Sequence, residues 1–575
     1  MQNRLHCIRQ FVQLMPRVAA VASSSPPTLV SSTKAVHRVG FNKVSVGWSL
    51  LFAFNLAVSP LKAYISETLP WHIIAPVATN ATLWSDDLNY TLAILQVLYN
   101  PTTMPDSTQT FRRDDTTYVI RAALVLSTPL VECDATLLRF PGAVFYGPAL
   151  RRAACAFLAQ NSSSPRTMTP ICQHVYMLAV PVVNTCLWVD GPSSTHFIVS
   201  FGAVNLESIP FAWCKLTWRC LLVGYILHLL WHSYYYHVWA LGHNLTTVGL
   251  RNPSTAVRYD LSVGDPTPLV LDHPFVSLVF VVDFYAGIDY VGLASIRVSQ
   301  VADVGQFALG CLYGSRAVWF GYFTMRYATY LVKWKRWECH VTSVDPGVLA
   351  LAAAFYAGPI YYMLANTPAV HLLYLLWSLQ PSGTLDRDAS IDVAAGCIAT
   401  LALLGSLPCM YAVGAPHVHR SQLVRSVSSL YAHPIEYNDL KIRLLWWLPR
   451  LWTKPSQTPV RDTGGCLYRM YDHNPRYKNL PLLSHRAADC FVGCYDDNVL
   501  TSRVRLSLRQ WLDLQPHDTD HAIQMCPASH HGQAICTISN TTCPNISPLS
   551  KLPLDQLSSN TTARHVFHAG TTAWV

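Results

Sequence analysis

Charged residues are scarce in this chain of 575 residues. Asp, Glu, Lys and Arg make up 13% of it and hydrophobic residues 51%, whereas soluble domains carry about 25% charged residues. The apolar residues also gather in runs, which is typical of helices that cross a lipid bilayer. A conventional soluble protein is therefore excluded, and the lipid bilayer is the first partner that the composition indicates.

Motifs of soluble enzymes are missing as well. The sequence has no Walker phosphate loop, no GxGxxG, no nucleophile elbow, no HExxH and no kinase signature. The basic residues lie beside the apolar runs rather than on a separate basic domain, so we expect no nucleic-acid partner. Nothing in the sequence gives positive evidence of enzyme chemistry.

Acidic residues are absent from the first 66 positions, and Glu67 is the first acid. The arm of residues 1–43 is basic, and residues 44–61 follow as an uncharged apolar run. A run of this length just crosses a hydrocarbon core of about 30 Å. We therefore expect a cytosolic arm followed by an uncleaved signal-anchor helix. An acid-free basic start also fits a mitochondrial transit peptide, and that alternative stays open.

Five further apolar runs follow in the segment 220–414. They cover residues 220–241, 275–295, 305–331, 346–365 and 393–413. With the first run they predict a polytopic α-helical membrane protein of about six transmembrane helices. A shorter apolar stretch after Pro368 would be a seventh span if it crosses, and the C-terminal tail would then change sides.

Lys and Arg near the runs give the orientation, because basic loops stay on the cytosolic side. Six spans place both termini in the cytosol, including the polar tail of residues 415–575. Lys215 and Arg219 oppose this arrangement, since they flank the second run on its outer side. In the tail, residues 440–454 mix basic and aromatic side chains, which predicts a helix at the membrane surface.

Residues 62–219 form the longest segment between runs, and they are long enough for a domain of their own. Stretches rich in β-branched and aromatic residues predict a β-rich or α+β ectodomain. Four cysteines on the oxidising side predict two disulfides, with three connectivities open. These cysteines are Cys133, Cys155, Cys172 and Cys186.

Glycosylation sequons begin at Asn80, Asn89 and Asn161, within the same segment, and predict a glycosylated surface. Sequons also begin at Asn540, Asn545 and Asn560 in the tail. Either these three are unused or the tail lies outside the cell. The charge pattern favours the first interpretation.

Four ionisable residues lie inside the predicted spans. Asp283 and Asp289 belong to the run 275–295, and Arg316 and Arg326 to the run 305–331. Such residues normally face a bundle interior or an aqueous cavity, pair with one another and often mark ion paths. We expect a structural ion pair between Asp283 and Arg316, with a transport or channel role as the alternative.

Three histidines, His228, His232 and His237, lie in the second run. Two imidazoles four residues apart suit a metal-ligand pair on one helix face. The sequence holds no matching cluster elsewhere, however, and a belt of His, Tyr and Trp at the membrane interface explains the same residues. We therefore expect no metal and no cofactor, and a membrane metalloenzyme stays the least favoured hypothesis.

The sequence thus predicts an integral membrane glycoprotein of the plasma membrane or secretory pathway. Its work would be to bind an extracellular or lumenal ligand, or to organise a surface, through residues 62–219. A transporter or channel that uses the intramembrane charges is the main alternative function, and a mitochondrial membrane is the alternative location.

Overall fold

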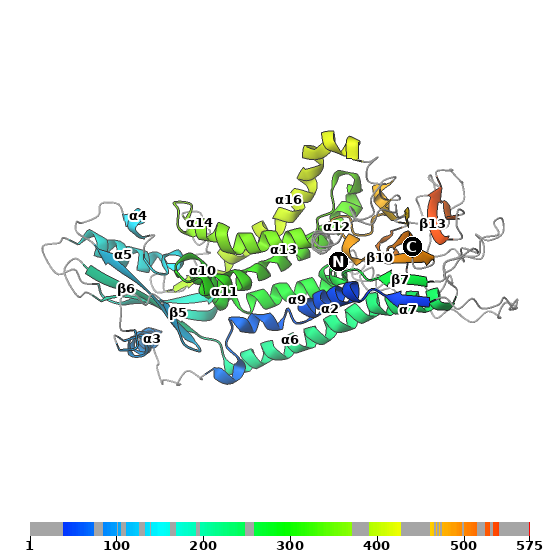
Figure 1. The fold of residues 1–575 in the computed structure, drawn as a ribbon. Coiled ribbons are helices and arrows are strands. Elements are labelled where there is room, and N and C mark those ends of the chain that lie inside the picture. Colours follow the sequence, from blue (N-terminus) through cyan, green and yellow to red (C-terminus); the bar gives the residue numbers. More distant parts are fainter. Residues whose placement is uncertain are drawn as a thin grey trace, which may run out of the picture. The chain divides into compact units, whose positions relative to one another are not determined.

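A computed structural model gives the fold of most of the chain (Figure 1). The residues that it describes are 38–73, 84–100, 102–104, 111–125, 133–137, 140–160, 168–190, 196–247, 258–370, 390–426, 461–464, 467–468, 471, 474–496, 499–513, 524–528, 533–539 and 574. They form a six-stranded sheet, a five-stranded sheet, a two-stranded hairpin and a set of helices. The signal-anchor interpretation of the first run concerns processing, which the fold does not address.

The six-stranded sheet is built almost entirely from residues 62–219. Its strand order is β2-β3-β6-β5-β4-β8, and only the short edge strand β8 runs parallel to its neighbour β4. The strands are β2 (Phe111–Arg113), β3 (Thr117–Val125), β4 (Ile171–Met177), β5 (Val180–Asp190), β6 (His196–Asn205) and β8 (Ser390–Asp392).

Alternating side chains give this sheet two buried faces. On one face, Phe201 and Ala203 pack with helices α5 (Pro148–Ala159) and α10 (Ile288–Ser299). On the other face, β5 and β6 lie against α3 (Trp84–Leu98). Gly202 makes the second contact possible, because a Cβ there would lie 2.8 Å from a methyl group of Leu95.

The five-stranded sheet combines three distant parts of the chain in the order β1-β7-β10-β11-β9. Its apolar side chains pack against helix α7 (Tyr236–Thr247). The strands are β1 (Arg38–Phe41), β7 (Arg258–Ser262), β9 (Arg461–Gly464), β10 (Cys490–Asp496) and β11 (Val499–Leu506). The arm and the tail, which the sequence suggests are separate cytosolic segments, thus contribute strands to one sheet. The hairpin comprises β12 (Gln524–Ala528) and β13 (Gln533–Ser539).

Helices connect and flank the two sheets. Helix α6 (Ile209–Leu230) follows β6 and continues through the π-helical turn Trp231–Tyr235 into α7, which precedes β7. The other α-helices include α2 (Lys43–Ala57), α4 (Cys133–Leu137), α8 (Thr267–Leu271), α9 (Pro274–Tyr285), α11 (Val304–Gly314), α12 (Val318–Lys335), α13 (Pro346–Phe355), α14 (Tyr361–Ala365) and α16 (Ala394–Ser426). Short 3₁₀ turns lie at η1 (Leu61–Ile65), η2 (Pro70–His72) and η5 (Ser315–Ala317), and the π-helical turn η7 (Tyr356–Ile360) joins α13 to α14.

Side chains in the helix core come from α2, α6, α9 and α12. The rings of Phe280 and Trp319 stack with their centroids 3.7 Å apart. Helix ends are capped by short polar residues, as the Asn42 side chain accepts hydrogen bonds from the first turn of α2 and Asp345 does the same for α13.

The prediction of about six transmembrane helices is wrong. Two helical stretches, Pro346–Ala365 and Ala394–Pro416, are long and apolar enough to cross a membrane. Among the residues that the structure describes, the number of candidate spans rises to four if each of two bent pairs is a single span. These pairs are Lys43–Ala57 with Leu61–His72, bent by 73°, and Pro274–Tyr285 with Ile288–Ser299, bent by 71°.

The reason is that a linear apolar run does not report where a helix breaks or what it packs against. The run 275–295 breaks at Gly287, where the Tyr313 hydroxyl packs so closely that an added Cβ would lie 2.5 Å from it. The run 220–241 is helical, but it contains three His and four Tyr, which lower its apolar character.

The two candidate membrane helices expose most of their apolar side chains. In the apolar window of Pro346–Ala365 only 11% of the residues are buried, and in that of Ala394–Pro416 28%. Phe355, Met363 and Met410 are among the large exposed side chains. Apolar surface of this extent is typical of contact with lipid or with another protein.

Candidate functional site

Six ionisable side chains form a buried cluster where the segment between α2 and α3 meets α6, α9 and η5. Its acids are Glu67, Glu207 and Asp283, and its bases are Lys215, Arg219 and Arg316. We call these six residues the ion cluster. Its three carboxylates and three cations balance in formal charge, as buried charges require.

Glu67 lies at the centre of the ion cluster. Its two carboxylate oxygens accept hydrogen bonds from Arg219 Nη1 at 2.6 Å and Arg219 Nη2 at 2.9 Å. Lys215 Nζ lies 3.2 Å from Oε2, Arg316 Nη1 lies 3.3 Å from Oε1, and the Tyr313 hydroxyl donates to Oε1 at 2.7 Å. A two-pronged arginine contact of this kind fixes the orientation of both groups.

Asp283 is the second acceptor. Its Oδ1 accepts from Arg219 Nε at 2.7 Å and from the Trp218 indole at 2.9 Å, and its Oδ2 pairs with Arg316. The structure thus places Asp283 against Arg316, as the helix positions suggest, but adds Arg219 as a bridge to Glu67. Lys215 also pairs with Glu207 at 2.7 Å, and burial raises the pKa of Glu207.

Sequence reasoning missed Glu67, Glu207, Lys215 and Arg219 as members of one site. Two signals were present: Glu67 is the first acid of the chain, and Lys215 and Arg219 are four residues apart, on one face of a helix. Each of the four is paired with an opposite charge of the ion cluster.

Asp289 lies apart from these pairs. It belongs to the first turn of α10, and its Oδ2 is buried with no hydrogen-bond partner among the residues that the structure describes. The same residue lines a cavity of about 200 Å³. A buried carboxylate oxygen without a partner is costly, so its position calls for an explanation.

The cavity lies between the six-stranded sheet and the apolar helices. The sheet contributes Val175, Val183 and Phe201, and α10 contributes Gly292. The other walls include Tyr361 of α14 and Leu401 of α16, which belong to the two candidate membrane helices. Most of the remaining lining is aliphatic or aromatic, which suits an apolar ligand.

Tyr118 of β3 is a polar residue in the cavity wall. Burial raises the pKa of its phenol, and the negative charge of Asp289 acts in the same direction. The phenol therefore stays protonated at neutral pH.

Two disulfides lie in or beside the six-stranded sheet. Cys133 of α4 is bonded to Cys155 of α5, and Cys172 of β4 to Cys186 of the neighbouring strand β5. This is one of the three connectivities that the sequence left open. The cysteines at positions 490 and 494, in the five-stranded sheet, are free thiols.

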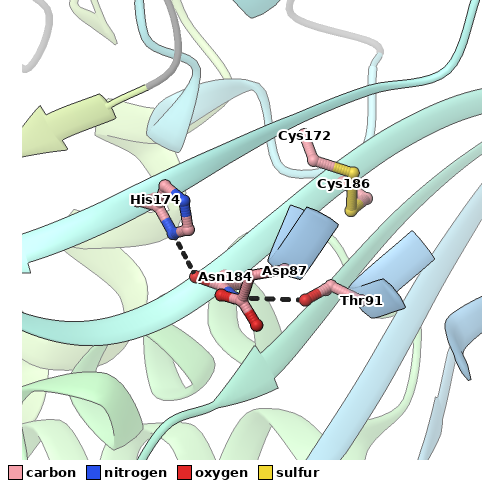
Figure 2. Close-up of a disulfide and its surroundings, with 6 residues drawn as sticks. All are labelled: Asp87, Thr91, Cys172, His174, Asn184 and Cys186. Atoms are coloured by element: carbon pink, nitrogen blue, oxygen red, sulfur yellow. Dashed lines mark hydrogen bonds between the residues drawn. A yellow bond between two sulfur atoms is a disulfide. The ribbon is translucent and has the colours of Figure 1, made fainter. Parts of the chain in front are cut away.

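Beside the second disulfide, a polar network joins α3 to the sheet (Figure 2). His174 Nδ1 lies 2.7 Å from Asn184 Oδ1, and the Asn184 amide donates to Thr91 and Asp87, at 3.1 Å in each case. The register pairs His174 with Asn184 on adjacent strands. The network holds α3 against β4 and β5 of the six-stranded sheet, and the disulfide links these two strands. We therefore assign both a structural role.

The three histidines of the second run do not form a metal site. His228 and His232 are exposed on α6 and the following π turn, with ring centroids 5.9 Å apart. His237 lies on α7, and its carbonyl accepts from the Trp574 indole at 2.9 Å. Within the described ranges, no group of three or more His, Cys, Asp or Glu side chains is placed to hold a metal ion.

The other predicted site residues are dispersed. Arg326 of α12 donates to the Tyr330 hydroxyl at 3.2 Å, one helical turn away, rather than to the ion cluster. Asn89 is exposed on α3. Asn80, Asn161, the tail sequons and the surface helix predicted at 440–454 lie outside the described residues.

Comparisons with known proteins found no match. No family model, no curated protein and no solved structure is similar to this chain. The function must therefore be argued from the geometry.

Proposed function

We propose that the chain is a membrane-associated binding protein whose ligand is apolar and occupies the cavity beneath the six-stranded sheet. The observation that carries this proposal is the composition of the walls. One wall is the sheet that residues 62–219 build, and the others include both helices that are apolar enough to enter a bilayer. An apolar ligand dissolved in the bilayer could therefore enter the cavity directly from the lipid.

The size of the cavity agrees with a small apolar group. An engineered cavity of about 150 Å³ with an apolar lining stays dry and binds benzene. Each methylene group transferred from water contributes about 0.8 kcal/mol. A chain of about eight carbons would thus gain several kcal/mol from burial.

The location that we propose is the secretory pathway or the cell surface. Disulfides form and persist in oxidising compartments, and both disulfides lie in the segment that forms most of the six-stranded sheet. The two apolar helices fit a membrane in such a compartment. Glycosylation of Asn80, Asn89 and Asn161 stays a prediction within this proposal.

A cavity-filling variant tests the binding function. Gly292→Leu places a side chain in the cavity wall, and its Cβ would meet only Phe145, at 3.9 Å or more. Octanol should raise the thermal unfolding midpoint of the purified wild-type chain, because a ligand that binds only the folded state stabilises it. The same concentration should leave the midpoint of Gly292→Leu nearly unchanged.

The matched control is Gly224→Leu, on the exposed side of α6, where an added Cβ meets nothing within 4 Å. This variant should respond to octanol as the wild type does. Because all three proteins are measured in the same detergent, partition of octanol into micelles affects them equally. An equal response of all three proteins, or no response of the wild type, would overturn the proposed function.

A further inference from the structure

Asp289 brings an acidic side chain into the largely apolar wall of the cavity. It lies in the wall together with aliphatic and aromatic groups, and its Oδ2 is buried without a hydrogen-bond partner in the described part of the chain. A carboxyl oxygen in this position can accept a hydrogen bond from a group inside the cavity. Such a group would remove the cost of leaving the oxygen unpaired.

In the described part of the chain, no cation lies within hydrogen-bond distance of this oxygen. Lys215, whose positive charge acts on Asp289, is held by Glu67 at 3.2 Å and Glu207 at 2.7 Å. Arg297 belongs to the same helix as Asp289, but its guanidinium donates to the Ser66 hydroxyl at 3.1 Å. The acids Glu67 and Glu207 act on Asp289 as well, and both are themselves paired with cations of the ion cluster.

We propose that the ligand of this cavity is an amphiphilic amine, with its apolar chain in the cavity and its protonated nitrogen bound to Asp289. The inference rests on the proposed function and names the ligand's head group. A protonated amine adds an opposite charge and up to three donors to its hydrogen bond, whereas a hydroxyl brings one donor and no charge, so an amine head is preferred. A carboxylate head is disfavoured, because it would bring a second acid to the same buried position.

Three ligands with one chain and different heads test this assignment. Octylamine, octanol and octanoate are titrated against the full chain at neutral pH, and apparent affinities are derived from the rise in the thermal midpoint. For the wild type we expect the order octylamine, octanol, octanoate. Asp289→Asn keeps the shape but removes the charge, and it should lower the affinity for octylamine roughly tenfold or more while changing that for octanol little.

Asp114→Asn is the matched control, because Asp114 is an exposed acid that does not line the cavity. It should leave the order and the affinities as in the wild type. Equal binding of the three ligands, or an equal affinity of the wild type and Asp289→Asn for octylamine, would overturn the head-group assignment and leave the proposed function standing. If none of the three ligands stabilises the wild type, the proposed function itself fails.

A second measurement covers the case in which Asp289→Asn does not fold. An octylamine derivative with a diazirine next to the nitrogen is photolysed on the wild-type chain, and the labelled peptides are identified by mass spectrometry. The proposal predicts labelling of peptides that contain Asp289 or Tyr118, reduced by an excess of octylamine and not of octanoate. Labelling confined to the exposed faces of α13 or α16 would contradict it.

Discussion

Arg219 shows how one residue can hold distant parts of this chain together. It joins Glu67, which follows the 3₁₀ turn η1, to Asp283 of α9, and its guanidinium also lies over the Tyr64 ring at 4.8 Å. Its side chain is fully buried. Loss of one partner in such a set leaves opposite charges buried and unpaired, which is more costly than the pair is worth.

Substitution of Arg219 by methionine therefore has a specific expected effect. Arg219→Met should destabilise the chain by about 3 to 5 kcal/mol, since Glu67 and Asp283 each lose a buried partner. The measurement is the thermal midpoint and the yield of monodisperse protein in gel filtration. Arg326→Met is the control, because Arg326 contacts Tyr330 on its own helix, and it should change stability by less than about 1 kcal/mol. Similar losses for both variants would refute the structural role of the ion cluster.

The sequence predicted only part of this site. The middle positions of Asp283 and Arg316 in adjacent apolar runs were enough to suggest their pairing. Lys215 and Arg219 were interpreted as topological signals beside a span, because a linear sequence does not show that Glu67 returns to their helix. Asp289 was grouped with the other intramembrane charges, and its role in a cavity wall depends on a sheet that is distant in sequence.

In the hairpin between β4 and β5, the loop residues adopt a backbone conformation that their residue types rarely adopt. Its two-residue loop is Leu178-Ala179, flanked by the pair Met177 and Val180. Both loop residues have positive φ, at 53° and 64°, which two-residue hairpins require and which Asn and Gly adopt more easily. Leu178 is also 66% exposed. The loop thus stores backbone strain at the end of the sheet.

An Asn-Gly pair in place of the two loop residues should relieve this strain. The double substitution L178N/A179G should stabilise the chain by about 1 to 2 kcal/mol, because left-handed backbone costs other residues about that amount. The measurement is the thermal midpoint without ligand. The double substitution L178S/A179S removes the same apolar surface but keeps the strain, so it should give little gain. An equal rise of the thermal midpoint in both variants would show that the removal of exposed apolar side chains, and not the relief of positive φ, stabilises the chain.

Element positions were easier to predict than element partners. Strands β3, β5 and β6 lie in the β-branched stretches of residues 62–219, and the apolar runs lie in helices. The short strands β1 and β8 could not be expected, because each is stabilised by a partner more than a hundred residues away. The break at Gly287 was equally hidden, since the side chains that pack closest to this glycine, Tyr313 and Glu67, are distant in sequence.

At the scale of the whole molecule, neither large sheet is made from one continuous segment. The five-stranded sheet needs strands from the N-terminal arm, from β7 and from the tail, and the six-stranded sheet receives β8 from just before α16. Contacts of such sequence separation form late, because loop closure must precede them. The cavity depends on the same long-range assembly, as its walls come from β3 to β6, α10, α14 and α16.

An experimental density map of the full chain in a lipid nanodisc tests the central claim most directly. We expect elongated non-protein density in the cavity between β5, α10 and α16, with one end within hydrogen-bond distance of the Asp289 carboxylate. We also expect lipid against the exposed faces of Pro346–Ala365 and Ala394–Pro416. A cavity closed by its own side chains, with those two helices surrounded by water, would contradict both the binding site and its membrane setting.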